Sequence, residues 1–139
     1  MNKTLEQWAE DFNKKTPEKF VRDERYELFY LPDKGFCEIG VTEKMLIIHQ
    51  LSGDGRFWKN FAEKLARLMN LKVCGTWCIR KEILAYIRLF GYKIIEVEEF
   101  SPKYKIYHCE DSTGRKARVA PAFYYKNVKV QAYYATWEV

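Results

Sequence analysis

The stretch Met45-Leu46-Ile47-Ile48-His49-Gln50-Leu51-Ser52-Gly53-Asp54-Gly55-Arg56 contains the change of pattern that decides the fold. Its first five residues are the most apolar run of the chain, which predicts a buried strand over residues 45–49. From Phe57 onward the apolar residues recur at helical spacing, and this predicts a helix that begins near Arg56 and ends near Asn70. The sequence therefore predicts a strand, a glycine-containing turn and a helix in direct succession.

The turn in the middle of this stretch has the features of an anion site. Gly53 and Gly55 let the backbone approach a ligand closely and adopt conformations that other residues avoid. The helix that follows directs its unpaired N–H groups and the positive end of its dipole toward the turn. Arg56 adds a full positive charge. Together these features predict a site that holds a pyrophosphate group.

The N-terminal side of the stretch predicts helix first and strands afterwards. Residues 5–12 show helical spacing, with Thr4 as a possible N-cap. Thr16-Pro17 predicts the start of a second, short helix that reaches about Arg25. Two strands, residues 27–30 and 36–41, then lead into the apolar strand. The short turns between them predict an antiparallel meander.

The C-terminal side continues with strand, helix and strand, and then with strands alone. We expect a strand over residues 71–77, in parallel or splayed pairing with the apolar strand, and a helix over residues 80–90 that Gly91 ends. Pro121 should mark a sheet edge or a bulge. The remaining predicted strands are residues 92–97, 104–109, 116–125 and 128–137. Because no repeat or linker interrupts the chain, we predict a single domain over residues 1–139.

The composition is that of a soluble globular protein, with 47% hydrophobic and 31% charged residues among 139. No apolar run reaches the length of about 18 residues that a spanning helix needs, so we expect a cytoplasmic protein that does not enter the membrane. The four cysteines lack the paired short spacing of a zinc site, and we expect buried thiols and no metal. The net charge of +5 suits a pyrophosphate cofactor, an RNA or an acidic protein and does not choose among them.

Two segments carry a resemblance to a known family. Gln50-Leu51-Ser52-Gly53-Asp54-Gly55 matches the pattern Gln/Arg-x-x-Gly-x-Gly/Ala, and Arg88-Leu89-Phe90-Gly91-Tyr92-Lys93-Ile94-Ile95-Glu96 has a helix end, a Gly-aromatic pair and a strand. In this order and at this distance the segments resemble the GNAT acetyltransferase family. The resemblance implies an α/β fold, with a GNAT-like mixed, mostly antiparallel central sheet and helices on both faces.

The same resemblance implies a function and a cofactor. The protein would be an N-acetyltransferase that moves an acetyl group from acetyl-CoA to a small-molecule or protein amine. Acetyl-CoA would lie between strands 45–49 and 71–77, with the strand around Ile48 beside its pantetheine arm and its pyrophosphate on the turn. The implied cofactor-binding residues are Ile48, Gln50, Leu51, Ser52, Gly53, Asp54, Gly55 and Arg56.

Acetyl transfer needs a base for the amine and an acid for the leaving thiolate, and three residues are candidates. Glu38 is a candidate base, although alternation along its strand favours an outward-facing carboxylate. His49 is a candidate base or orienting group, although a packed histidine at a strand end is the favoured alternative. Tyr86 is the candidate acid, one place from the position of the family's helix tyrosine, where this chain has Ile87.

Two other functions stay open at this stage. One is a catalytically silent GNAT-fold protein, of an accessory or phage type, that binds a macromolecular partner. The other is nucleic-acid binding by the C-terminal strands, where aromatic and basic residues interleave. The residues concerned are Tyr104, Tyr107, Phe123, Tyr124, Tyr125, Tyr133, Tyr134 and Trp137, with Lys103, Lys105, Arg115, Lys116 and Arg118. The oligomeric state does not follow from the sequence.

Overall fold

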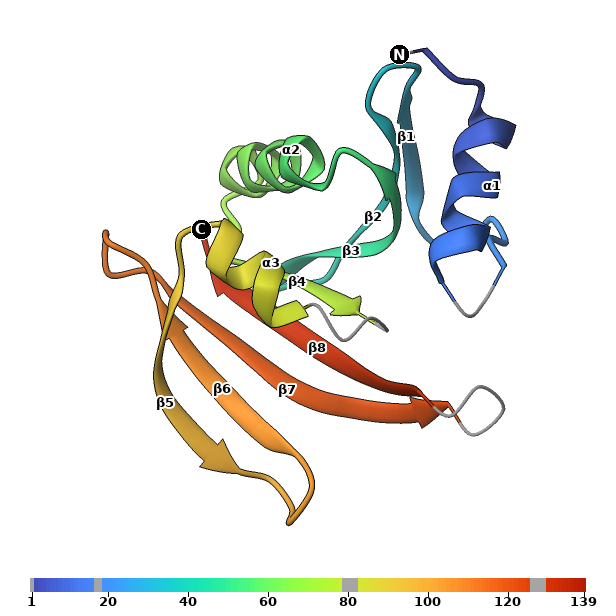
Figure 1. Cartoon of the computed structure of the whole chain (residues 1–139). Coiled ribbons are helices and arrows are strands. Elements are labelled where there is room, and N and C mark those ends of the chain that lie inside the picture. Colours follow the sequence, from blue (N-terminus) through green and yellow to red (C-terminus); the bar gives the residue numbers. More distant parts are fainter. Residues whose placement is uncertain (1, 17–18, 79–82, 126–129) are drawn as a thin grey trace. The chain divides into compact units, whose positions relative to one another are not determined.

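The chain forms two compact units, residues Met1–Cys74 and Gly75–Val139, which are described separately (Figure 1). The structure is a computed structural model, and it describes residues 2–16, 19–78, 83–125 and 130–139. Because the division falls within strand β4 (Val73–Cys78), the sheet of each unit is considered by itself. The single domain that the sequence predicts stays a prediction.

The first unit contains the predicted antiparallel meander. Its strands are β1 (Glu27–Leu31), β2 (Gly35–Val41) and β3 (Met45–Gly53). The meander is confirmed, but β3 continues four residues beyond His49, because Leu51 lies opposite Cys37 and Ser52 lies opposite Phe36 in the ladder with β2. Most of the predicted turn is therefore strand.

Two helices cover opposite faces of this meander (Figure 1). They are α1 (Leu5–Lys15), which Thr4 caps as predicted, and α2 (Gly55–Leu68). The Phe12 ring of α1 lies 6.1 Å from that of Phe36. The Phe61 ring of α2 lies 4.9 Å from that of Phe29, which is opposite Cys37, the neighbour of Phe36. Since adjacent strand residues point to opposite faces, the helices lie on the two sides of the sheet.

The second helix that the sequence predicts is absent over residues 19–25, so this prediction is wrong there. Pro17 and Glu18 lie outside the described residues. Side chains take up the backbone N–H groups that a helix would use: Asn13 Oδ1 accepts from the Phe20 N–H at 2.6 Å, and Glu38 accepts from the Asp23 N–H at 2.9 Å. The segment is not helical because these distant acceptors replace the helical ones.

The second unit contains a sheet whose strands run in the order β8-β7-β6-β5 with antiparallel pairing, and its described residues include the helix α3 (Ile83–Leu89). Pro121 lies opposite Tyr133, and the register shifts before Tyr124, so the predicted bulge is confirmed. The strands are β5 (Lys93–Glu99), β6 (Lys105–Glu110), β7 (Lys116–Tyr125) and β8 (Val130–Glu138).

The predicted fold class is confirmed: the chain is α/β, and the strand pairings described above are antiparallel. Within the described residues, no helix is long and apolar enough to cross a membrane. Cys37, Cys74 and Cys109 are buried free thiols, as expected. Burial raises the pKa of all three thiols, that of Cys74 to about 12.

The two glycines of the turn differ in what surrounds them, which leads to a test of stability. Gly53 has φ +107°, and a Cβ there would collide with the Lys34 carbonyl oxygen and lie 2.9 Å from the Gly35 Cα. A Cβ at Gly55 would meet nothing within 4 Å. We predict that Gly53→Ala lowers the free energy of unfolding by about 1–3 kcal/mol. Gly55→Ala should leave it unchanged or raise it by up to about 1 kcal/mol. Urea unfolding measures the free energy of unfolding of both variants. Equal values would contradict the conclusion that the backbone requires glycine at position 53 and not at position 55.

Candidate functional site

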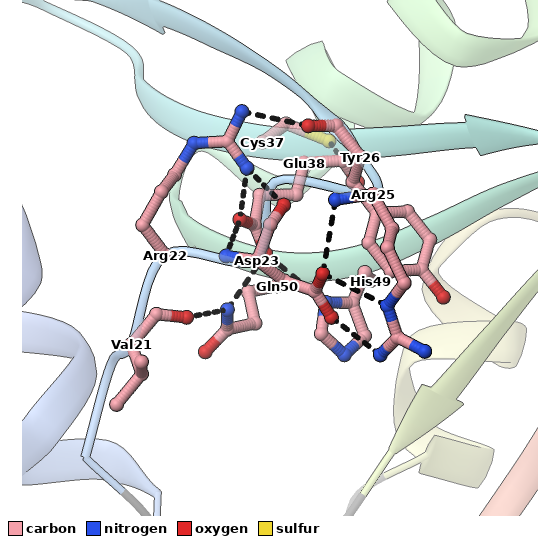
Figure 2. A network of polar contacts seen from close by, with 9 residues as sticks. All are labelled: Val21, Arg22, Asp23, Arg25, Tyr26, Cys37, Glu38, His49 and Gln50. Carbon is pink, nitrogen blue, oxygen red and sulfur yellow. Dashed lines mark hydrogen bonds and ion pairs between the residues drawn. The ribbon is translucent and has the colours of Figure 1, made fainter.

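The centre of the first unit is a buried carboxylate with four hydrogen-bonding partners (Figure 2). Glu38 is 0% exposed. Its Oε2 accepts from Arg22 Nη1 at 2.8 Å and from the Asp23 N–H at 2.9 Å. Its Oε1 accepts from Gln50 Nε2 at 2.6 Å and contacts His49 Nδ1 at 3.0 Å. The outward-facing carboxylate that the strand alternation favours is therefore wrong, and Glu38 is the best-connected side chain of this unit's polar network.

These contacts occupy the carboxylate. A carboxylate has about four lone-pair positions, and two hydrogen-bonding partners lie at each oxygen of Glu38. Arg22 also supplies the positive charge that a buried carboxylate needs. Because the oxygens are engaged and shielded from solvent, Glu38 has no position left at which to take a proton from a bound amine.

A β-bulge explains how two consecutive residues reach the same carboxylate. Cys37 lies opposite Leu51 and Ile39 lies opposite Ile48, so Glu38 faces two residues of β3, His49 and Gln50. In a regular strand their side chains would point to opposite faces. A bulge bends the strand and re-aims one of them, and such irregularities are frequent next to active sites.

The segment of residues 19–26, here called the arm, is held against Glu38 and Gln50 by side-chain contacts. Gln50 Nε2 donates to the Val21 carbonyl at 2.8 Å, and Arg22 Nη2 donates to the Tyr26 carbonyl at 2.6 Å. Arg25 donates to the Asp23 carboxylate, and these hydrogen bonds hold the pKa of Asp23 well below its usual value. The arm and the strands therefore share one polar network.

The His49 ring lies between this network and the surface. It stacks on the Tyr26 ring, with centroids 4.3 Å apart and planes 13° apart. Gly40 makes room for that ring, since a Cβ there would lie 2.6 Å from Tyr26 Cδ1. The His49 side chain is 31% exposed. Among the described residues none bonds to its Nε2. The ring is packed, as one of the two sequence interpretations expects, and a catalytic role of His49 stays a prediction.

The predicted cofactor-binding residues fall into two groups, and those before Gly53 belong to the core of the unit. Ile48 is buried in β3, and Leu51 is half-buried. Ser52 Oγ donates to the Trp8 carbonyl at 2.8 Å. Since Gln50 bonds to Glu38 and Val21, the side chains of both Gln50 and Ser52 have internal partners.

The residues from Gly53 to Arg56 surround the start of α2. The Asp54 carboxylate accepts from the Phe57 N–H at 3.0 Å and lies 3.6 Å from Lys34 Nζ, so the helix is capped by a negative charge. Gly55 leaves open space beside it, and the Arg56 side chain is exposed. An incoming phosphate group would find free space and a positive side chain here, with the Asp54 charge opposing it.

The second unit contains the remaining candidates. Tyr86 lies in α3, but its side chain is outside those that the structure describes, so its role stays a prediction. Trp137 of the aromatic group is buried and Tyr124 is exposed, while the rings that lie half-buried are Tyr104, Tyr107, Tyr133 and Tyr134. Nucleic-acid binding by this sheet stays a prediction, as does the splay between the strands 45–49 and 71–77.

Sequence reasoning missed Arg22, Asp23, Tyr26 and Gly40. One signal was available, namely a lone carboxylate, Glu38, in an otherwise apolar strand, because a buried charge requires a partner. Arg22 itself gives no such signal, since it stands in the charged run Arg22-Asp23-Glu24-Arg25, which has the composition of a solvated loop.

The network leads to a prediction about stability. Glu38→Gln should lower the free energy of unfolding by about 3–5 kcal/mol, because a buried ion pair loses one partner and the amide presents donors to donors. Glu27→Gln on the exposed strand β1 is the matched control and should change it by less than about 0.5 kcal/mol. Urea unfolding compares the two, and similar values would contradict the central role of Glu38.

Comparisons with known proteins add evidence about the fold. No protein-family model and no curated protein matches the chain. Among solved structures, the crystal structure of Ard1 from Thermoplasma volcanium is similar, with a TM-score of 0.51, 12% identity, and coverage of 100% of this chain and 95% of that chain. At this identity the similarity shows the fold alone. The chain has a mixed α/β fold with mostly antiparallel strands, similar to the fold of Ard1.

Proposed function

We propose that the protein is an N-acetyltransferase that transfers an acetyl group from acetyl-CoA to an amine. The observation that carries the proposal is the similarity of the whole chain to Ard1, an N-acetyltransferase of the GNAT family. The polar network around Glu38 and the start of α2 supply, within one unit, a titratable group and an anion site of the kinds that such a reaction needs.

The pyrophosphate of acetyl-CoA would bind at the start of α2. The first N–H groups of a helix lack intrahelical acceptors, and the open space at Gly55 lets a ligand approach them. Arg56 adds a positive side chain. Acetyl-CoA, when bound, would supply an activated thioester. The chain would then bind the cofactor, hold the amine and move its proton, with Tyr86 as the proposed acid.

A second function is favoured by two observations. Asp54 places a negative charge at the α2 N-terminus, where the pyrophosphate would bind, and the side chains of Gln50 and Ser52 are used internally. These features suit a protein that keeps the fold and binds a macromolecular partner without catalysis. Cofactor binding and turnover must therefore be measured separately.

Acetyl-CoA should raise the melting temperature of the protein. At a concentration 100 times Kd, the added stability is about 2.7 kcal/mol. Gly55→Val should abolish the shift, because its side chain would fill the space beside the α2 N-terminus. Asp54→Asn should strengthen binding, because asparagine still caps the helix but carries no negative charge. Thermal unfolding with and without the cofactor measures all three proteins, and Gly55→Ala is the control for a change in stability.

Two results would contradict the proposal, one for cofactor binding and the other for catalysis. The absence of any shift at millimolar acetyl-CoA would exclude the cofactor site. A shift in the wild type without release of the CoA thiol, over a panel of small amines and peptide N-termini, would exclude the enzyme and support the silent protein.

A further inference from the structure

We propose that His49 is the general base of this reaction, acting through Nε2, and that Glu38 is a positioning residue that holds the imidazole in the required tautomer. The inference rests on the proposed function. It assigns different roles to two residues that the sequence offers as alternative bases.

The hydrogen-bond network determines which nitrogen of His49 carries the proton. Arg22 Nη1 and the Asp23 N–H can only donate to Glu38. Gln50 must also present its Nε2, because the same atom donates to the Val21 carbonyl. The carboxylate thus acts as an acceptor throughout, and His49 Nδ1, 3.0 Å from Oε1, must carry a hydrogen. In the neutral ring, the lone pair is then on Nε2.

The surroundings of the ring hold that lone pair in a fixed direction. Tyr26 covers one face of the imidazole, and Glu38 fixes the rotation of the ring through Nδ1. The partial exposure of His49 leaves a route for an amine, and no described residue bonds to Nε2. A carboxylate, a histidine and an open nitrogen in this order are the arrangement that activates a base in many enzymes.

Charges on both sides of the ring bear on the proton transfer. The imidazolium that forms would lie against Glu38, which favours it, while Arg22 on the other carboxylate oxygen opposes it. Asp23 also interacts with the charge of His49, although the Asp23 carboxylate already forms an ion pair with Arg25. Tyr26 contributes a neutral, stacked ring.

The proposed step removes two protons from the acceptor nitrogen. His49 Nε2 takes one proton from the acceptor ammonium, which leaves an amine with a free electron pair. That pair forms the new C–N bond to the acetyl carbon as the C–S bond of the thioester breaks. The sulfur keeps the electron pair of that bond, and the second proton lost by the nitrogen converts it to the thiol. His49 then releases its proton to solvent.

The first test needs no cofactor or activity. Nitrogen-15 NMR of the histidine side chains should show His49 with its hydrogen on Nδ1 in the wild type. Glu38→Asp, which keeps the charge but shortens the side chain, should shift His49 toward a mixture of tautomers. His49 and His108 are the two histidines of the chain, so His108→Gln assigns the signals. A hydrogen on Nε2 of wild-type His49 would overturn the proposal.

The second test uses turnover. His49→Gln should lower kcat by about 10²–10⁴-fold, leave the KM for acetyl-CoA within twofold and remove the acid limb of the pH–rate profile. Glu38→Asp should lower kcat by about 10–100-fold. His108→Gln is the matched control, because His108 also contacts a carboxylate at 3.0 Å, but that carboxylate, Glu98, is 55% exposed. We expect its kcat to be unchanged.

The base assignment and the proposed function can fail separately. If the wild type acetylates amines and His49→Gln retains its kcat within twofold, the base assignment is wrong and the proposed function stands. If the wild type binds acetyl-CoA but acetylates nothing, the proposed function fails and the base assignment falls with it, whatever tautomer NMR shows.

Discussion

The buried charge of Glu38 is the constraint on which the first unit depends. Moving a carboxylate out of water costs several kcal/mol unless charge and hydrogen bonds replace the lost hydration. Four donors from the arm and β3 do so, and each has a structural consequence. Arg22 and the Asp23 N–H hold the arm in a non-helical conformation. His49 and Gln50 can both reach the carboxylate because β3 bulges opposite it.

The same constraint connects stability to the proposed chemistry. Glu38 cannot release its contact with His49 without leaving an oxygen unsatisfied in the core, so the histidine is held in one orientation. Tyr26 adds a second restraint to the ring, and that restraint exists only because Gly40 has no side chain. A site in which the packing of the core fixes the reactive group needs little reorganisation when a substrate arrives.

Most elements of the fold could be predicted because their signals are local. Helical spacing over α2, the Thr4 cap and the Pro121 bulge each depend on a few neighbouring residues. The site could be predicted only in part, because its contacts join residues that are distant in the sequence. Nothing in the run around Arg22 shows that it meets Glu38, 16 positions away. The strand of Glu38 is also buried on both faces from Gly35 to Ile39, so the expectation of a solvated face failed where the function is proposed.

The glycines of the turn show how one motif can combine two requirements. Gly53 is needed by the fold itself, since its backbone meets the Lys34–Gly35 turn and its φ is positive. A protein with this meander would keep a glycine there whether or not it bound a cofactor. Gly55 has no such role, because the first position of a helix accepts a side chain and open space surrounds it. The information about a ligand is therefore concentrated in Gly55. The match at Gly53 reflects the close approach of β3 to the Lys34–Gly35 turn instead.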